Sequence, residues 1–140
     1  MTTEHWEHYP HEADMGIRGI GETKERSFAM SAAALTAIIT DLDNVKHEIP
    51  VDISCDAPDD ELLLADWLNA LIYEMATRKV LFSRFEVQIS GHHLQATAWG
   101  EKVDIGKHQP AVEIKGATYT DLHVRQTTDG KWIAQCVVDV

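Results

Sequence analysis

Hydrophobic residues recur at helical spacing in two stretches of the chain. The first runs from Lys24 to about Thr40, and Thr23 before it is a residue type that suits a helix N-cap. The second follows the acidic segment 56–61, whose proline and carboxylates suit the positive end of a helix dipole, and it extends to about Lys79. The spacing therefore predicts two amphipathic helices. Their apolar positions are Phe28, Ala32, Leu35 and Ile39 in the first and Leu64, Leu68, Leu71 and Met75 in the second.

Alternation of apolar and polar residues predicts strands in most of the remaining chain. Successive side chains of a strand point to opposite faces, so an apolar residue at every second position marks a half-buried strand. The Asp129-Gly130 pair is a strong signal for a tight hairpin turn. The predicted strands are residues 6–9, 15–20, 49–55, 81–90, 94–100, 111–115, 119–126 and 132–140, and residues 101–110 are expected to form a loop.

The order of these elements indicates the fold class. Two strands, a helix, a strand, a second helix and a strand meander favour an α+β fold, with two helices packed on a mostly antiparallel sheet. No internal repeat or linker interrupts the pattern, and the length of 140 residues suits one domain. We therefore expect a single domain spanning residues 1–140.

Charge narrows the range of partners. Lys and Arg together number 12 and Asp and Glu 23, which gives a formal net charge of −11. Phosphate groups attract basic side chains, so an acidic domain of this kind is not expected to bind nucleic acid strongly by itself. The same argument disfavours an anionic membrane surface. The charge is compatible with a basic partner or with a bound cation.

The cysteines and the N-terminal segment indicate the cellular compartment of the protein. Cys55 and Cys136 lie far apart in apolar surroundings, which favours two reduced core thiols, although their sequence positions also permit a disulfide. The polar segment 1–11 differs from a signal peptide, and no apolar run approaches the roughly 20 residues of a membrane span. We expect a cytoplasmic protein.

The chain has no familiar catalytic motif, such as a nucleophile elbow, a phosphate loop or a zinc-protease helix. His5, His8 and His11 would share one face of a helix and could bind zinc there, but their segment has the pattern of a strand and a loop. Surface or capping histidines are therefore preferred over a zinc site. The acidic segments 41–43 and 56–61 are candidate cation sites, but each also fits the end of a helix.

A pair of acidic residues near the two ends of the chain is less usual. Asp14 follows a short loop and precedes a strand, whereas Asp139 stands in an otherwise apolar run as the penultimate residue. By alternation, Asp139 shares a strand face with Ile133, Gln135 and Val137. The side chain of Asp139 belongs either to a solvated, frayed terminus or to a paired arrangement. Carboxylate oxygens gathered from Asp14, Asp139 and the chain end would suit a hard cation.

At these residues the sequence resembles the archease family. The resemblance covers essentially the whole chain, and it rests on the order and spacing of several short blocks together with the acidic ending. The blocks are HEADMGI (11–17), DWLNALIY (66–73), LFSRFEV (81–87), AWGE (98–101), KH (107–108), KGATY (115–119) and DV (139–140).

This resemblance implies a protein cofactor and not an enzyme. Archeases assist an RNA ligase of the RtcB type, which joins a 2′,3′-cyclic phosphate or 3′-phosphate end to a 5′-hydroxyl end with GTP and Mn²⁺. They speed guanylylation of the ligase and support its multiple turnover, chiefly in tRNA splicing and RNA repair. An alternative function for the family is that of a chaperone-like module for a tRNA or RNA methyltransferase.

The resemblance also implies a site for a divalent cation, calcium or another hard ion. Its ligands would be Asp14, Asp139 and the main-chain carboxylate of Val140. Residues that would border the site are His11, Glu12, Lys115 and Thr118. Two positions depart from the family pattern: Glu12 stands where threonine is frequent, and Thr120 stands where a histidine is usual.

Overall fold

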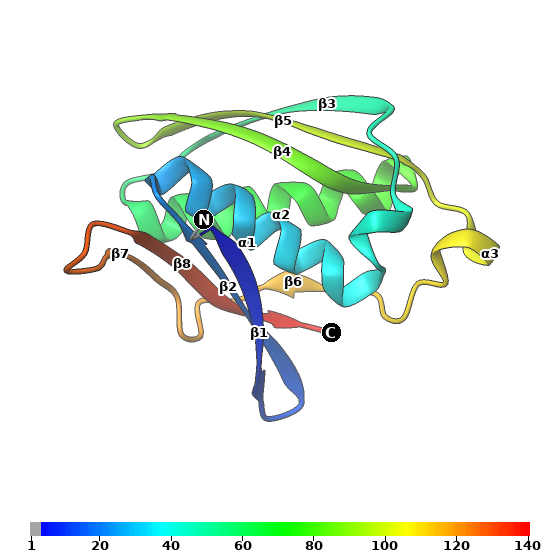
Figure 1. The fold of residues 1–140 in the computed structure, drawn as a ribbon, viewed down its shortest axis with the longest axis horizontal. Coiled ribbons are helices and arrows are strands. Elements are labelled where there is room, and N and C mark those ends of the chain that lie inside the picture. The colour runs from blue at the N-terminus through cyan, green and yellow to red at the C-terminus, as the bar shows by residue number, and fades with distance from the viewer. Residues whose placement is uncertain (1–3) are drawn as a thin grey trace.

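Two antiparallel sheets enclose two long helices in the computed structural model, which describes residues 4–140. Figure 1 shows the three layers, with the sheet β3-β5-β4 above, α1 and α2 between, and the sheet that contains β1, β2 and β8 below. The layers share one hydrophobic core, to which both helices and both sheets contribute. The α+β class is confirmed, and the strands divide into two sheets that pack on opposite sides of the helices.

Helix α1 begins after the predicted cap residue, and α2 begins within the acidic segment that was expected to precede it. Helix α1 (Lys24–Ile39) starts after Thr23, whose hydroxyl accepts a hydrogen bond from the Arg26 backbone N–H at 3.1 Å. Helix α2 (Asp60–Arg78) starts after Asp59, which caps the Leu62 N–H in the same way. Pro58 therefore precedes the cap and does not lie in the first turn. Two short helices, η1 (Leu42–Asn44) and α3 (Ile105–His108), lie in the connections.

The five-stranded sheet joins the two ends of the chain. Strand β1 (His5–His11) forms a hairpin with β2 (Asp14–Gly21), and β2 pairs with the last strand, β8 (Trp132–Asp139). The other edge of β8 is occupied by the short strands β6 (Gly116–Ala117) and β7 (His123–Gln126). The C-terminal strand is thus an interior strand of the sheet.

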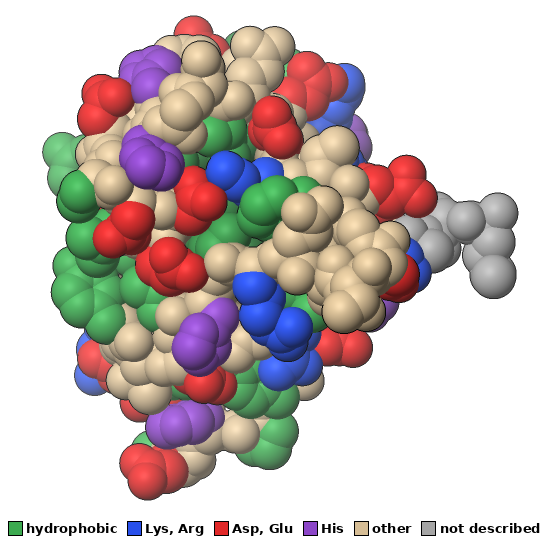
Figure 2. All heavy atoms as spheres, turned by 90° about the vertical axis from the view of Figure 1, so that its left-hand side faces the viewer, with side chains coloured by type: hydrophobic (Ala, Val, Ile, Leu, Met, Phe, Trp, Pro, Cys, Tyr) green, Lys and Arg blue, Asp and Glu red, His purple; other side chains and the backbone are tan. Residues whose placement is uncertain are grey.

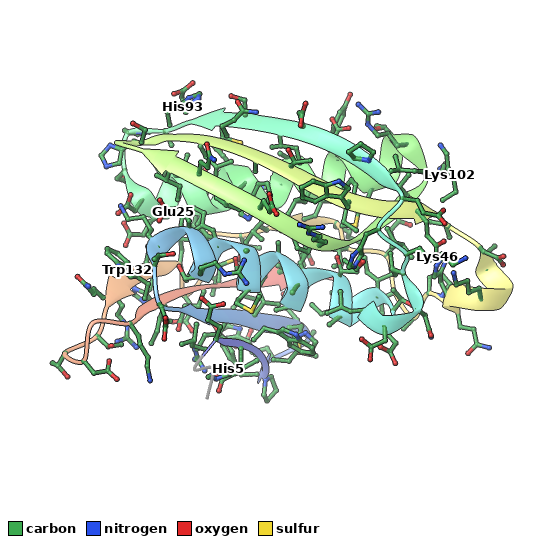
Figure 3. The ribbon with its side chains drawn as sticks, turned by 45° about the horizontal axis from the view of Figure 1, so that its top comes forward. His5, Glu25, Lys46, His93, Lys102 and Trp132 are labelled. Carbon is green, nitrogen blue, oxygen red and sulfur yellow. The ribbon has the colours of Figure 1, made fainter. Side chains whose placement is uncertain are left out.

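The three-stranded sheet covers the opposite side of the helices. It consists of β3 (Ile49–Asp56), β5 (His93–Lys102) and β4 (Val80–Ser90), with β5 in the middle. Its outer face carries many polar and charged side chains (Figure 3). Arg84 lies over the Trp99 ring on this face, with 4.6 Å between the guanidinium carbon and the ring centroid.

Close packing of α1 on β2 depends on glycine. A Cβ atom at Gly19 would lie 2.2 Å from the Ser31 backbone nitrogen and 2.3 Å from the Ser27 carbonyl oxygen. The helix backbone therefore rests directly on this strand. Because Gly19 faces α1, alternation places Asp14, Gly16 and Arg18 on the other face of the sheet, which we call the outer face.

One predicted strand is absent and another is shortened. Residues 111–115 were expected to form a strand, but they run as an irregular segment, and the Ala111 N–H donates to the Ile39 carbonyl at 2.8 Å. This bond holds the segment against the end of α1, away from the sheet edge that β6 occupies. Residues 119–126 give only β7, and the expected loop 101–110 contains the end of β5 and α3.

Candidate functional site

Asp14 and Asp139 come together through strand register. Met15 pairs with Val138 in the antiparallel ladder between β2 and β8, and continuing that register by one residue places Asp14 opposite Asp139. Both residues lie on the outer face and both are partly buried. Side chains opposite each other on antiparallel strands have Cβ atoms about 5 Å apart. Two carboxylates from opposite ends of the chain are therefore neighbours.

The end of β8 is held along the edge that pairs with β6. The Lys115 N–H donates to the Asp139 carbonyl at 2.8 Å, and Gly116 pairs with Asp139 in the ladder. Val140 is partly buried, and its side chain packs against the hydrophobic core. Of the two interpretations of Asp139, these contacts favour the ordered strand end over a frayed terminus.

The expected bordering residues lie on two sides of this pair. His11 pairs with Asp14 to close the β1–β2 hairpin, and Glu12 occupies its tight turn with a φ of 54°, in the left-handed region. On the other side of β8, the Thr118 backbone N–H and hydroxyl both donate to the Val137 carbonyl, at 3.0 and 2.7 Å. The Lys115 side chain is exposed and makes no ion pair among the residues that the structure describes.

Asn69 supports the same edge from α2. Its side-chain amide accepts a hydrogen bond from the Ala117 N–H at 2.9 Å and donates to the Ala117 carbonyl at 3.4 Å. This double contact holds β6 against the helix. Since β6 pairs directly with the end of β8, Asn69 helps to fix the backbone beside Asp139.

A polar cluster on the outer face was missed by the sequence reasoning. Arg18 donates to Glu7 and Gln135, each at 2.9 Å, and its guanidinium lies 4.6 Å from the centroid of the Tyr9 ring. The Tyr9 hydroxyl donates to Asp121 at 2.9 Å. The cluster therefore joins β1, β2 and β8 to the loop before β7. The only sequence signal for it was Arg18, a charged residue inside an apolar strand.

Tyr9 connects this cluster to the strand segment that carries Asp14, because it lies opposite Gly16 in the register of β1 and β2. Its ring lies on Gly16, the residue between Asp14 and Arg18 on the outer face, and a Cβ atom at Gly16 would be 2.2 Å from the ring. Burial and the hydrogen bond to the Asp121 carboxylate raise the pKa of Tyr9 well above its usual value. The neutral phenol is therefore held over Gly16, on the face that carries Asp14.

The other candidate groups are not brought together. The His8 ring nitrogen lies 2.7 Å from the Ala34 carbonyl on the helix side of the sheet, whereas His5 and His11 share the outer face. Asp41 and Asp59 act as helix caps. Across residues 4–140, no three His, Cys, Asp or Glu side chains lie close enough to hold a metal ion. A cation at Asp14 and Asp139 would therefore need a further oxygen ligand, such as a main-chain carboxylate.

Charge on the surface is mixed. Figure 2 shows one end of the molecule, where acidic, basic and histidine side chains alternate without forming a continuous basic area. Eight of the ion pairs join a Lys or Arg to an acid, so most of the 12 basic side chains are locally neutralised. Among the described residues, no helix is both long and apolar enough to cross a membrane.

Comparison with known proteins gives one consistent result. A family model described as the archease protein family (MTH1598/TM1083) matches residues 6–140. The chain is similar to protein archease of Pyrococcus furiosus, at 38% identity over 139 residues that cover 96% of this chain and 98% of the relative. It is also similar to protein archease of Methanopyrus kandleri, at 36% identity with 96% and 99% covered. Both relatives carry the name of the family that the model describes.

Solved structures agree with this result. The solution structure of Methanobacterium thermoautotrophicum protein 1598 matches with a TM-score of 0.84 and 29% identity, covering 96% of this chain and 98% of that one. The crystal structure of an archease from Thermotoga maritima, described as a possible chaperone, matches with a TM-score of 0.58 over 94% of each chain. At 19% identity, the latter supports the fold alone.

Proposed function

The chain belongs to the archease family, and on that premise we propose that it activates an RNA ligase of the RtcB type. It promotes guanylylation of the ligase and multiple turnover during tRNA splicing or RNA repair, and it performs no chemistry of its own. A divalent cation held by Asp14, Asp139 and the main-chain carboxylate of Val140 takes part. The proposed setting is the cytoplasm, a compartment that suits the two free thiols, Cys55 and Cys136.

The observation that carries the proposal is the pairing of Asp14 with Asp139. Like charges at this spacing repel each other, and a bound cation would remove that repulsion. All of the proposed donors are oxygen atoms, which are the ligands that hard cations such as Ca²⁺, Mg²⁺ and Mn²⁺ prefer. The Val140 side chain packs against the hydrophobic core, which supports an ordered chain end at this position.

The overall charge supports a division of labour with the ligase. A protein with a net charge of −11 and mostly neutralised basic side chains is a poor ligand for RNA. It is suited to present carboxylates and a cation to a protein partner that itself holds the nucleotide and the RNA ends. The proposal therefore includes no direct role in RNA recognition.

A guanylylation assay with a cognate ligase tests this function. We expect the wild-type protein to increase the rate of ligase–GMP formation and Asp14→Asn or Asp139→Asn to remove that increase. Asp52→Asn is the matched control, because Asp52 is an exposed carboxylate on the other sheet and, among the described residues, its side chain hydrogen-bonds Thr97 alone. In calorimetric titrations, the wild type and Asp52→Asn should bind Ca²⁺ and Mn²⁺, whereas Asp14→Asn and Asp139→Asn should lose this binding. Full stimulation by both site variants would refute the proposal.

A second candidate function rests on the description of the Thermotoga maritima relative as a possible chaperone. In this alternative the protein is a binding module for an RNA methyltransferase and needs no cation. Suppression of methyltransferase aggregation that persists in a chelator, and in Asp14→Asn, would favour it over ligase activation.

A further inference from the structure

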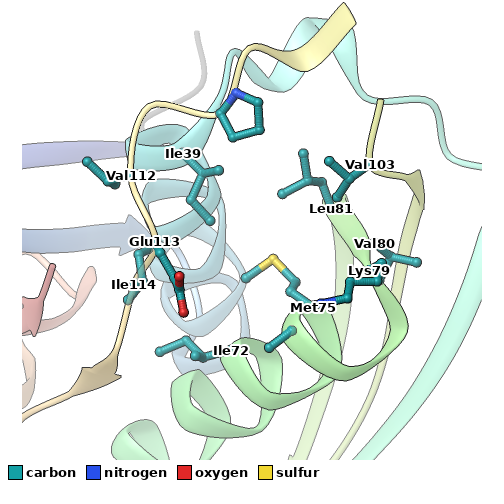
Figure 4. A pocket seen from close by; sticks show the side chains of 12 residues that line it. Ile39, Ile72, Met75, Lys79, Val80, Leu81, Val103, Val112, Glu113 and Ile114 are labelled. Carbon is teal, nitrogen blue, oxygen red and sulfur yellow. The ribbon is translucent and has the colours of Figure 1, made fainter. Parts of the chain in front are cut away.

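An apolar cavity of about 360 Å³ opens between the C-terminal ends of the two long helices. Figure 4 shows the side chains that line it, which come from α1, α2, the start of β4 and the irregular segment 110–114. Ile39, Ile72 and Met75 form much of its apolar surface. The volume lies within the range of about 300–1,000 Å³ that is typical of small-molecule sites.

The irregular segment 110–114 forms one wall of this cavity. Val112 and Ile114, the two residues that gave the segment its strand-like alternation, both line the space. The bond from the Ala111 N–H to the Ile39 carbonyl fixes the wall to α1. The segment therefore uses its apolar residues to shape a cavity at the position where a further sheet strand was expected.

Two charged side chains reach the cavity from opposite sides. Lys79 follows α2 as its C-cap residue, and Glu113 comes from the wall segment (Figure 4). Neither forms an ion pair or a side-chain hydrogen bond within the part of the chain that the structure describes. Both charges are therefore available to a ligand.

Two unpaired basic side chains, Lys79 and Lys102, lie at or beside this cavity although the protein is acidic. Within residues 4–140, four Lys and Arg side chains make no ion pair with an acid: Lys79, Lys102, Lys115 and Arg125. Lys79 lines the cavity, and Lys102 is the chain neighbour of the lining residue Val103. Lys102 is held near Lys79 by its hydrogen bond to the Arg78 carbonyl at 2.9 Å. Lys79 and Lys102 thus outnumber Glu113, the one acid among the residues that line the cavity.

We propose that this cavity binds a medium-chain carboxylate, with the hydrocarbon body among Ile39, Ile72 and Met75 and the carboxylate beside Lys79. Burial of the chain supplies most of the affinity, because each buried CH₂ contributes about 0.8 kcal/mol, which corresponds to about a fourfold gain. The rim lysines select the sign of the headgroup, and Glu113 directs the carboxylate to the Lys79 side of the opening.

Octanoate, octanol and octylamine, which share a chain length and differ in charge, test the proposal on the full chain. Dissociation constants and the affected methyl groups are measured by NMR titration. We expect octanoate to bind most tightly and octylamine most weakly, with shifts concentrated at Ile72 and Ile114. Replacing octanoate by hexanoate should weaken binding by roughly 15-fold, as expected for two fewer CH₂ groups.

Variants separate the cavity from general hydrophobic binding. Ala76→Phe fills the mouth of the cavity from an exposed helix position and should abolish octanoate binding, whereas Thr77→Phe, on the next exposed position outside the lining, should not. Lys79→Glu should reverse the order of octanoate and octylamine, and Glu113→Gln should strengthen octanoate binding by about two- to fivefold. Unaltered binding in Ala76→Phe, or equal affinity for octanoate and octylamine, would overturn the proposal.

Discussion

The Nε2 atom of His108 lies 2.8 Å from the Oε1 atom of Glu101 at the end of β5. The His108 side chain is fully buried, and we call the hydrogen bonds around it the clamp. The His108 Nδ1 accepts a hydrogen bond from the Asp104 backbone N–H at 2.9 Å, so the ring carries its proton on Nε2 and donates to Glu101. The Thr40 hydroxyl donates to the His108 carbonyl at 2.6 Å and joins the clamp to α1. The clamp fixes the connection that leads to the wall of the apolar cavity.

The clamp predicts a defined loss of stability in acid. Hydrogen bonds from Lys107 and then from His108 lower the pKa of Glu101 to about 2, whereas an unfolded glutamate has a pKa of about 4.3. The stabilisation is therefore complete above the unfolded value and is lost as pH falls from about 4 towards 2. Glu101→Gln should flatten this part of the curve of melting temperature against pH. Glu86→Gln, which removes an exposed partner of Arg84, should leave the same part unchanged.

The raised pKa of Tyr9 predicts a loss of stability in alkaline solution. Because burial and Asp121 raise the pKa of Tyr9, the folded protein favours the neutral phenol and loses stability as pH rises above the usual tyrosine value of about 10. Tyr9→Phe should remove the last step in an alkaline titration followed by phenolate absorbance. At neutral pH it should cost about 1 kcal/mol, the typical contribution of one hydrogen bond. A last step that is the same in Tyr9→Phe would contradict the assignment.

Gly19→Ala tests the contact between α1 and β2. The added methyl group would overlap the Ser31 nitrogen and the Ser27 carbonyl, and helix backbone cannot yield as a flexible side chain does. Overpacking of this kind typically costs about 1–3 kcal/mol, which should lower the melting temperature by several degrees. Gly106→Ala is the control, since its nearest contact is the Asp104 carboxylate at 3.5 Å. Equal melting temperatures for the two variants would contradict the close packing.

Extension of the chain beyond Val140 tests the terminal carboxylate in the proposed cation site. Additional residues convert this carboxylate into a neutral peptide group, which keeps an oxygen donor but removes its charge. We expect a short C-terminal extension to weaken Ca²⁺ binding by at least tenfold and to reduce ligase stimulation, whereas the same residues placed before Met1 should change neither. Equal calcium affinity for the two extended proteins would remove Val140 from the ligand set.

Local sequence signals predicted the elements of the fold better than their arrangement. The cap at Thr23 and the turn at Asp129-Gly130 depend on neighbouring residues, and such signals can be recognised in the sequence, whereas Asp59 was not identified as the cap of α2. Division of the strands into two sheets depends on which faces of α1 and α2 each strand covers, which periodicity along the chain does not encode. The strand predicted for residues 111–115 was wrong for a related reason. Alternation shows which residues are buried, but not whether a strand or the wall of a cavity buries them.

In the candidate site, too, local sequence signals identified some residues, and only the structure revealed the others. Asp14 and Asp139 stood out because an acid is unusual in each local context, and strand register brings them face to face. The Tyr9–Asp121 bond and the support of β6 by Asn69 connect positions whose types are ordinary for their surroundings. Their importance follows only from pairing between distant segments, so no local pattern could have identified them.

The interior position of β8 has a consequence for how the five-stranded sheet folds. Every strand of the five-stranded sheet other than β1 pairs with β8, and β1 reaches it only through β2. The N-terminal hairpin therefore depends for its pairing within the sheet on a strand that is distant from it in the sequence. Long loop closure of this kind slows folding and leaves strand edges exposed in the meantime. Loss of β8 would therefore leave β2, β6 and β7 without their common pairing partner, and β6 and β7 could not remain in the sheet by their own pairing alone.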